Sequence, residues 1–188
     1  MQENLEAVGE MTNYQDWIYS CIAPHIGAEV LEAGCGNGWA TRIIKKHKHC
    51  IKAIGVDGSK NMIIKANERD PSGNYVCANL ESYSPSKTVD IVYSMEVLYY
   101  LSDPESLLKN IYAKWIKTTG VFIFGIDHYR ENQATLKWPQ RYNLYMNTLK
   151  TEKWISFTKK AGFQNVQHWN MQANKENQGT LIIMGEKP

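Results

Sequence analysis

The chain has 188 residues, of which 43% are hydrophobic and 21% are charged, and its 21 basic and 19 acidic side chains leave a net charge of +2. This length and composition are typical of a single globular domain and exclude disorder over the whole chain. The near-neutral charge argues against a nucleic-acid partner, and no apolar run is long enough to suggest a membrane partner.

The N-terminus and the cysteines indicate a cytoplasmic protein. Residues 1–10 lack the basic and apolar regions of a signal peptide. The four cysteines lie far apart and form no Cys-x-x-Cys pair, so we expect reduced thiols and no bound metal. The basic run at 45–49 is interpreted as the solvated end of a helix.

Taken in chain order, the hydrophobic pattern predicts strands and helices that alternate along most of the chain. We expect helices over 4–23, 39–47, 59–69, 103–116 and 151–160. We expect strands over 29–33, 50–56, 75–78, 89–94, 121–126, 166–171 and 180–184. Ser59 is expected to cap the third helix, Pro104 to lie in the first turn of the fourth, and Gly120 to end it.

This alternation predicts an α/β fold with right-handed crossovers. The last two strands have no helix between them, so they must pair as an antiparallel hairpin. We therefore expect one domain over residues 1–188: a seven-stranded, mostly parallel sheet with an antiparallel C-terminal hairpin and helices on both faces.

The first two strands end on residues that suit a nucleoside cofactor. Segment 30–38 reads as a buried strand that runs into a turn with glycines at 34, 36 and 38, and Asp57 ends the second strand. Glycines allow close approach of a ligand, and an acid about 20 residues later suits ribose hydroxyls. The G-x-G-x-x-G spacing of dinucleotide-binding proteins is absent, since Trp39 stands in its last slot. This disfavours the alternative of a nucleotide-dependent oxidoreductase.

The sequence Glu-x-Gly-x-Gly-x-Gly at 32–38 resembles the first motif of the class I S-adenosylmethionine (SAM)-dependent methyltransferases. The resemblance extends over about 29–187, with the strand at 89–92 and the turns at 117–120 and 160–163 in the order of that family. It implies that SAM is the cofactor and S-adenosylhomocysteine (SAH) the product. The cofactor residues that it implies are Glu32, Gly34, Cys35, Gly36, Gly38, Asp57, Gly58, Met62, Asn79, Leu80 and Met95.

Several of these residues receive individual roles from the resemblance. Glu32 would organise the loop or help hold the methionine part of SAM, and Asp57 would bind both ribose hydroxyls. Met62 would pack on adenine; a plain core role is the alternative, and the two roles are compatible. Asn79 stands where the family usually has an acid; its carbonyl can accept from the adenine amino group, and the backbone of Leu80 can bind the ring. Cys35 is interpreted as a small space-filling residue in the turn.

The acceptor is expected at the ends of the fourth and fifth strands. No Asn-Pro-Pro-Tyr motif follows the fourth strand, which argues against a DNA base as acceptor. His128 follows the fifth strand; its imidazole is a candidate general base, with a structural histidine as an equally weighted alternative. Tyr14 is a second catalytic candidate, which would help fix the sulfonium region. The candidate acceptor-binding residues are Trp17, Tyr99, Tyr129, Trp138 and Tyr142.

Two segments are expected to complete this site. Residues 1–24 are expected to form a helical lid over the cofactor, with packing onto the sheet as the alternative, and residues 129–150 an insert that builds the acceptor pocket. The predicted function is methyl transfer from SAM to a small molecule by a monomer or homodimer. The alternatives are a non-catalytic SAM-binding or interaction module and a protein methyltransferase. Alignment alone can supply most of the acceleration, so a dedicated base is not required.

Overall fold

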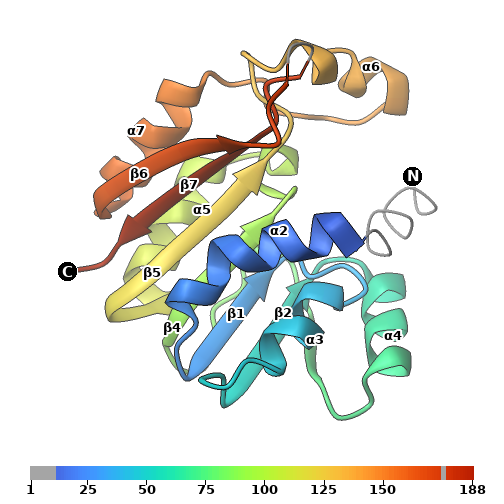
Figure 1. The fold of residues 1–188 in the computed structure, drawn as a ribbon, viewed down its shortest axis with the longest axis vertical. Helices are drawn as coiled ribbons and strands as arrows, with labels where there is room; N and C mark the ends of the chain where they lie inside the picture. The colour runs from blue at the N-terminus through green and yellow to red at the C-terminus, as the bar shows by residue number, and fades with distance from the viewer. Residues whose placement is uncertain (1–11, 175–176) are drawn as a thin grey trace.

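The computed structural model describes residues 12–174 and 177–188, and the side chains of the first helix from residue 16 onward. One seven-stranded sheet crosses the middle of the molecule in the order β3-β2-β1-β4-β5-β7-β6 (Figure 1). The strands are β1 (Glu29–Ala33), β2 (Lys52–Asp57), β3 (Asn74–Cys77), β4 (Val89–Met95), β5 (Ile116–Ile126), β6 (Gln164–Met171) and β7 (Thr180–Glu186).

Strand pairing confirms the predicted topology. The strands from β3 to β5 pair in parallel, whereas β7 is antiparallel to both β5 and β6. The sheet reverses its strand order between β1 and β4, and the carboxyl ends of these strands are where an open α/β sheet places its ligand.

The described part of the chain also contains six α-helices and four short 3₁₀- or π-helical segments. The α-helices are α2 (Thr12–Ile22), α3 (Trp39–Lys45), α4 (Lys60–Arg69), α5 (Pro104–Asn110), α6 (Trp138–Tyr142) and α7 (Thr151–Ala161). The shorter segments are η1 (Ala23–His25), η2 (Leu98–Tyr100), η3 (Ile111–Trp115) and η4 (Gln133–Thr135). No described helix has the length and apolar character needed to cross a bilayer.

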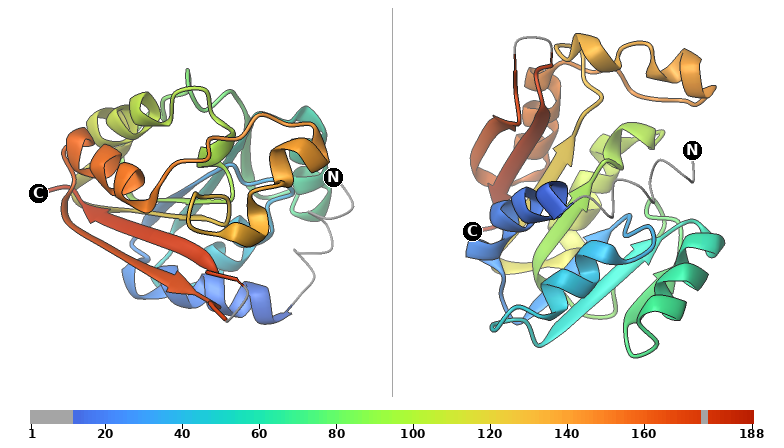
Figure 2. Two further views of the ribbon diagram at one scale, coloured as in Figure 1. Left: turned by 90° about the horizontal axis from the view of Figure 1, so that it is seen from above. Right: turned by 45° about the vertical axis from the view of Figure 1, so that its right-hand side comes forward.

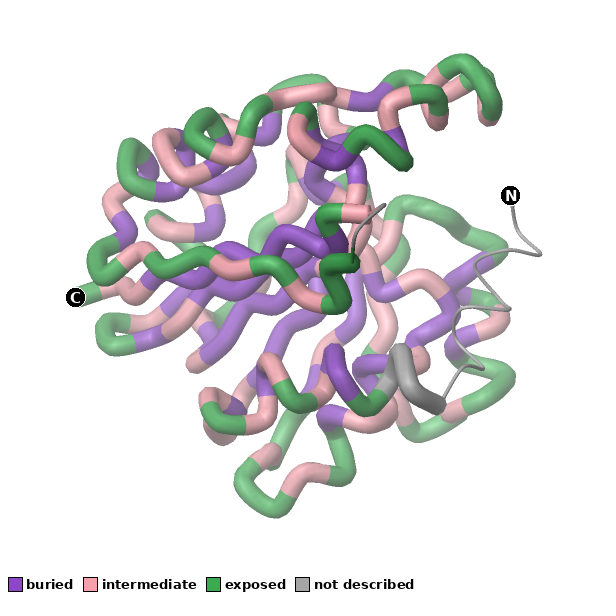
Figure 3. Tube along the Cα trace, turned by 45° about the horizontal axis from the view of Figure 1, so that its top comes forward, coloured by how far each residue is buried: buried purple, intermediate pink, exposed green. Residues whose placement is uncertain are grey.

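Alternate residues of the central strands point into two different cores. Val30 and Ile91 face the side covered by α2 and α3, whereas Leu31 and Val92 face the side covered by α5 and α7. Figure 2 shows the two helical layers on opposite sides of the sheet, and Figure 3 shows that burial is concentrated along the strands. This alternation is the period-2 pattern of a strand buried on both faces.

The helix ends confirm several residue-level predictions. Ser59 caps α4, because its side chain accepts a hydrogen bond from the Met62 N–H at 3.4 Å. Pro104 occupies the first turn of α5, which Asp103 caps. Gly162 ends α7 with φ +115°, a conformation that strongly favours glycine.

The predicted helix over 103–116 is confirmed up to Trp115, whereas the predicted start of the fifth strand at 121 and the role of Gly120 are wrong. Helix α5 ends at Asn110, a π-helical turn follows, and β5 already begins at Ile116. The Lys117 ammonium bridges Glu29 at 2.8 Å and Asp90 at 2.9 Å, which fixes this stretch beside β1 and β4. Gly120 therefore lies inside β5, where it lets the strand approach its neighbour closely.

The lid prediction is wrong for the second half of α2. Trp17, Ile18 and Ile22 are buried in the core against residues of β1, β4 and α3. Residues 1–11 lie outside the described residues, so the prediction remains for that segment alone. The packing alternative explains residues 17–22, because an amphipathic helix gains more from burial on the sheet than from a free position.

Candidate cofactor and acceptor site

The loop after β1 combines close packing with one open side. Gly34, Gly36 and Gly38 have φ values of +84°, +52° and +77°. A Cβ at Gly34 would overlap Val97, and one at Gly38 would lie 2.5 Å from the Tyr75 ring. A Cβ at Gly36 would meet nothing within 4 Å. The outer glycines are thus needed for packing, and the middle one borders space that a ligand can enter.

Asp57 joins the end of β2 to this loop. Its Oδ2 accepts from the Gly36 N–H at 2.8 Å and its Oδ1 accepts from the Ser59 N–H at 2.8 Å. Each carboxylate oxygen has a further lone pair with which to accept a hydroxyl. The carboxylate is therefore suited to two vicinal hydroxyls beside the open side of the glycine loop.

Glu32 lies near the end of β1, just before the glycine loop. Its side chain is buried and accepts a hydrogen bond from the Thr41 hydroxyl of α3. Burial raises the pKa of Glu32 to about 8, with a smaller contribution from the nearby Asp57 charge. At neutral pH the carboxyl is mainly protonated. Of the two roles considered for Glu32, organising the loop and holding the methionine part of SAM, this fits the first.

Cys35 fills space, as predicted. It is buried, and its sulfur lies close to Gly55 of β2, where a Cβ would come within 2.8 Å of it. Burial raises the pKa of this thiol above its ordinary value, so no reactive thiolate forms at neutral pH.

The predicted adenine-side residues divide into two groups. Met62 and Leu80 are buried, and Leu80 belongs to the core on the α5–α7 side. Asn79 and Gly58 are exposed beside the end of β3. The Asn79 side-chain carbonyl accepts from the Glu81 N–H at 3.0 Å, so it forms an Asx turn. Its predicted contact with an adenine amino group would use the remaining lone pair.

Two carboxyl groups that the sequence reasoning missed lie at the ends of β4 and β5. Glu96 follows Met95 with φ 59°, and its Oε2 accepts from the Tyr99 hydroxyl at 2.9 Å. Asp127 follows β5, and its Oδ1 accepts from the Thr180 hydroxyl at 2.5 Å. Burial raises the pKa of both carboxyls, and for Glu96 the proximity of Asp127 raises it further. Their positions directly after two strands are the signal by which the sequence could have indicated them. The sequence did not indicate that both carboxyls would be buried.

His128 does not have the geometry of a general base. It is fully buried, with Nδ1 3.1 Å from the Thr135 carbonyl oxygen and Nε2 2.8 Å from the Thr148 hydroxyl. Because a carbonyl only accepts, Nδ1 carries the proton and Nε2 accepts from Thr148. Burial lowers the pKa of the ring. Both nitrogens are occupied, so the structure favours the structural alternative over the predicted proton acceptor.

The candidate acceptor-binding residues are only partly brought together. Tyr99 packs edge-on against His128, and Trp138 stacks on the same ring. Tyr142 lies against Trp138 on α6. These three aromatic residues therefore form one group around His128, in which Tyr99 contacts Glu96.

The remaining two acceptor-binding candidates and Tyr14 lie elsewhere or outside the description. Tyr129 is buried and donates to the Gly179 carbonyl at 3.0 Å, so it fastens the β6–β7 loop. Trp17 lies in the core under α2. Their placement in the acceptor pocket is corrected, because core packing and an internal hydrogen bond use them fully. The Tyr14 side chain is outside the described residues.

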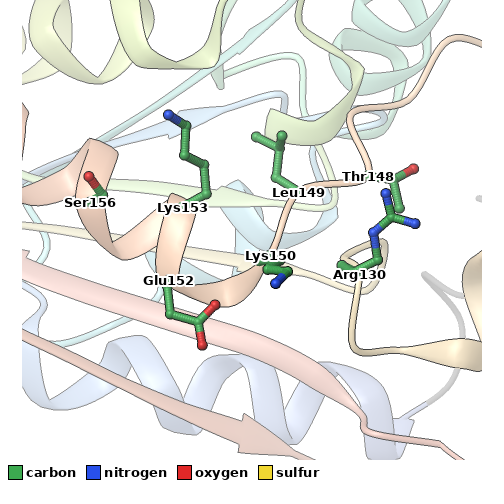
Figure 4. Close-up of a pocket in the computed structure, with 7 residues that line it drawn as sticks. All are labelled: Arg130, Thr148, Leu149, Lys150, Glu152, Lys153 and Ser156. Carbon is green, nitrogen blue, oxygen red and sulfur yellow. The ribbon is translucent and has the colours of Figure 1, made fainter.

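A pocket of about 500 Å³ lies elsewhere, between the segment after β5 and α7 (Figure 4). Its lining residues are Arg130, Thr148, Leu149, Lys150, Glu152, Lys153 and Ser156. None of them belongs to the glycine loop or to the ends of β1 and β2. It is therefore separate from the candidate cofactor site.

A family profile described as "Methyltransferase domain" matches residues 31–124, which run from β1 through most of β5. The chain belongs to this family. The matching family and the solved structures with the same fold are class I SAM-dependent methyltransferases, whose cofactor is SAM. The matched region includes the glycine loop, Asp57 and the end of β4.

Individual relatives resemble parts of the chain. Trans-aconitate 2-methyltransferase of Klebsiella pneumoniae is 26% identical over 113 residues, which are 60% of this chain and 45% of that protein. The tRNA U34 carboxymethyltransferase of Alteromonas mediterranea is 25% identical in an alignment 170 residues long, which covers 81% of this chain and 51% of that protein. The chain thus spans about half the length of the curated relatives it matches.

A solved structure shows the same fold. The N-methyltransferase NodS from Bradyrhizobium japonicum, in complex with SAH, superposes with a TM-score of 0.71 at 16% identity, over 96% of this chain and 88% of that one. The geometry of the site fits the family's cofactor, because Gly36 borders open space and Asp57 offers lone pairs next to it. The buried Asn37 Oδ1 in the same loop also accepts no hydrogen bond from any described residue.

Proposed function

We propose that this chain is a SAM-dependent methyltransferase that acts on a small molecule. The observation that carries the proposal is the open side of Gly36, with the Asp57 carboxylate hydrogen-bonded to the same residue. Together they offer a side-chain-free surface and a hydroxyl-binding acid within one loop. This combination suits a nucleoside with a flexible amino-acid extension.

Each part of the cofactor has residues that suit it. The loop at 34–38 would hold the methionine part, Asp57 the ribose hydroxyls, and Met62 one face of adenine, with Asn79 and Leu80 at the ring edge. When bound, SAM supplies a methyl group on a positively charged sulfur. The protein's contribution is then to align an acceptor with that methyl group and to exclude water, which accounts for most of such an acceleration.

The residues around the acceptor position support a small, partly flat molecule. Trp138 and Tyr142 of α6 are half-buried beside Tyr99, and the net charge of +2 gives no broad basic surface for a nucleic acid. His128 would position this aromatic group: its two hydrogen bonds join β5 to η4 and to the segment before α7. We expect the protein to act in the cytoplasm as a monomer or homodimer.

Titration calorimetry with SAM and SAH tests the cofactor part of the proposal. We expect dissociation constants in the micromolar range, or roughly −7 to −8 kcal/mol. A screen of small acceptors by mass spectrometry, with SAM present, then tests turnover. Binding without any methylated product would favour the non-catalytic module instead, and the absence of SAH binding would contradict the proposal as a whole.

A further inference from the structure

The carboxyl group of Glu96 is held in an incomplete hydrogen-bonding environment. Its φ of 59° is rare for a residue with a side chain and persists only where neighbours impose it. The Glu96 N–H donates to the Gly125 carbonyl at 2.9 Å, and Oε2 accepts from Tyr99. Oε1 is buried and has no hydrogen bond of ordinary geometry from any described residue, although the Asp127 N–H lies near the carboxyl and favours its charged form. A buried oxygen of this kind is costly unless a proton or a ligand donor reaches it.

The surroundings of Glu96 favour a cationic donor. Asp127, the second carboxyl group, lies near enough to raise the pKa of Glu96. Neither carboxyl forms an ion pair with a Lys or Arg within residues 12–174 and 177–188. Two carboxyl groups without a counter-charge attract a cation and repel an anion.

Glu96 also lies beside the candidate cofactor loop. The next residue, Val97, occupies the space where Gly34 would carry a Cβ. The preceding residue, Met95, packs on Gly125 of β5 in the same way. The Glu96 backbone is thus fixed between the glycine loop and β5, next to where a transferred methyl group would arrive.

Aromatic rings border Glu96 on the solvent side. Tyr100 is 38% exposed, and its ring centroid lies 4.4 Å from that of buried Tyr99. Burial raises the pKa of Tyr100, and the charge of Glu96 raises it further, so the two groups lie near each other. Aromatic faces beside a carboxylate are favourable surroundings for an ammonium ion. Arg141, which lies over the Tyr142 ring at 5.5 Å, is exposed on α6.

We infer that the acceptor is an amine and that the Glu96 carboxyl binds its nitrogen and receives the proton that the nitrogen loses. The inference rests on the proposed methyltransferase function and specifies its substrate class. The bound ammonium first gives a proton to the ionised form of Glu96, which frees the nitrogen lone pair. That lone pair forms the new N–C bond, the electron pair of the broken C–S bond stays on sulfur, and the proton then passes from Glu96 to water. Carboxylate acceptors are disfavoured, because they would face Glu96 and Asp127.

Matched probes test the substrate class without requiring turnover. Two sets of compounds that differ in one group are titrated by ligand-observed NMR into protein saturated with SAH: 2-phenylethylamine, 2-phenylethanol and 3-phenylpropanoate, and butylamine, butan-1-ol and pentanoate. We expect the amine of at least one set to bind tenfold or more tightly than its alcohol, since charge-assisted hydrogen bonds are the stronger ones. The carboxylates should bind least. If neither amine exceeds its alcohol, the inference is overturned.

Substitution of Glu96 tests the residue itself. Glu96→Gln should weaken amine binding tenfold or more and leave the SAH dissociation constant within twofold. Glu68→Gln makes the same chemical change at an exposed position on α4 and should alter neither. Amine binding within twofold of wild type in a folded Glu96→Gln protein would contradict the assignment, and the probe comparison stands even where that variant does not fold. Failure of the wild-type protein to bind SAH would instead refute the proposed function.

A probe of fixed charge separates binding from a structural role. The charge of phenylethyltrimethylammonium does not change with pH, whereas the Glu96 carboxyl, whose pKa is raised, gains charge as pH increases. Affinity for this probe should therefore rise with pH in the wild type and rise less in Glu96→Gln. The pH dependence that remains in Glu96→Gln comes from Asp127, whose pKa is also raised. Tyr99 and Tyr100 do not contribute, because burial raises their pKa values above the ordinary value for tyrosine. A pH-independent affinity in the wild type would contradict the inference.

Discussion

Replacement of Glu32 by glutamine should change how the stability of the protein depends on pH. The Glu32 pKa is about 8 in the folded protein, against 4.5 for the free side chain. Between these values the folded state retains a proton that the unfolded chain releases. The free energy of unfolding therefore decreases as pH rises from about 4.5 to about 8, and the decrease stops above that range.

The magnitude follows from the number of protons retained. Between pH 5 and pH 7 the folded state holds nearly one more proton than the unfolded chain, at about 1.4 kcal/mol per pH unit, so wild type should lose about 2–3 kcal/mol through this group. The amide introduced by Glu32→Gln cannot ionise and can still accept from the Thr41 hydroxyl. Glu96 and Asp127 titrate in both proteins, so their contributions cancel in the difference between the two.

Urea unfolding of the ligand-free protein, followed by tryptophan fluorescence, measures this difference. Trp115 and Trp154 are fully buried and report loss of the core. At pH 5, 6, 7 and 8 the Glu32→Gln variant should gain stability relative to wild type with each step, with the smallest increment at the highest pH. Stability curves that stay parallel over this range would refute the assignment of a raised pKa to Glu32.

Four further predictions concern individual residues. Asp57→Ala should weaken SAH binding by about 2–3 kcal/mol, because it removes charged hydrogen bonds; Asp103→Ala, which removes only the α5 cap, should leave the calorimetric dissociation constant unchanged. Gly36→Val should fold yet fail to bind SAH, whereas Gly34→Val should lower the melting temperature through overlap with Val97; normal SAH binding by folded Gly36→Val would exclude this loop as the cofactor site. His128→Ala should lower stability by about 2 kcal/mol or more and leave the shape of the pH–rate profile intact, so loss of its acid limb alone would restore the general-base role. Trp17→Ala should destabilise by about 3–5 kcal/mol in urea unfolding, as expected for a core tryptophan, and an unchanged stability would favour a lid instead.

Much of the fold was readable from local patterns in the sequence. The succession of hydrophobic runs along the chain, the cap at Ser59 and the glycine at 162 are decided within a few residues, and the structure agrees with all three. The start of β5 at Ile116 rather than at 121 was not readable, because it depends on an ion-pair cluster of Lys117 with Glu29 and Asp90, which lie 88 and 27 residues away. The local pattern at 116–120 gave no indication of that contact.

The glycine loop depends on residues close together in the sequence, whereas the acceptor side depends on contacts between distant residues. A turn of closely spaced glycines followed by an acid is a local pattern, and the positive φ values and the Gly36–Asp57 hydrogen bond agree with it. His128 stands at the predicted strand end, but its function depends on what its two nitrogens contact. Those partners, Thr135 and Thr148, come from a segment with irregular structure, for which the sequence offers no periodicity.

Glu96 shows what a strand-end position alone leaves undecided. The acceptor was expected at the end of the fourth strand, yet five of the seven residues at 94–100 are apolar or aromatic and the one acid gave no further signal. Its left-handed backbone turns the side chain into a buried position beside Tyr99, and a sequence does not state which non-glycine residue will adopt that conformation. Residues with such strain cluster at functional sites in native proteins. The strained, incompletely hydrogen-bonded Glu96, rather than the relaxed and fully hydrogen-bonded His128, is therefore the residue on which acceptor chemistry at this site should depend.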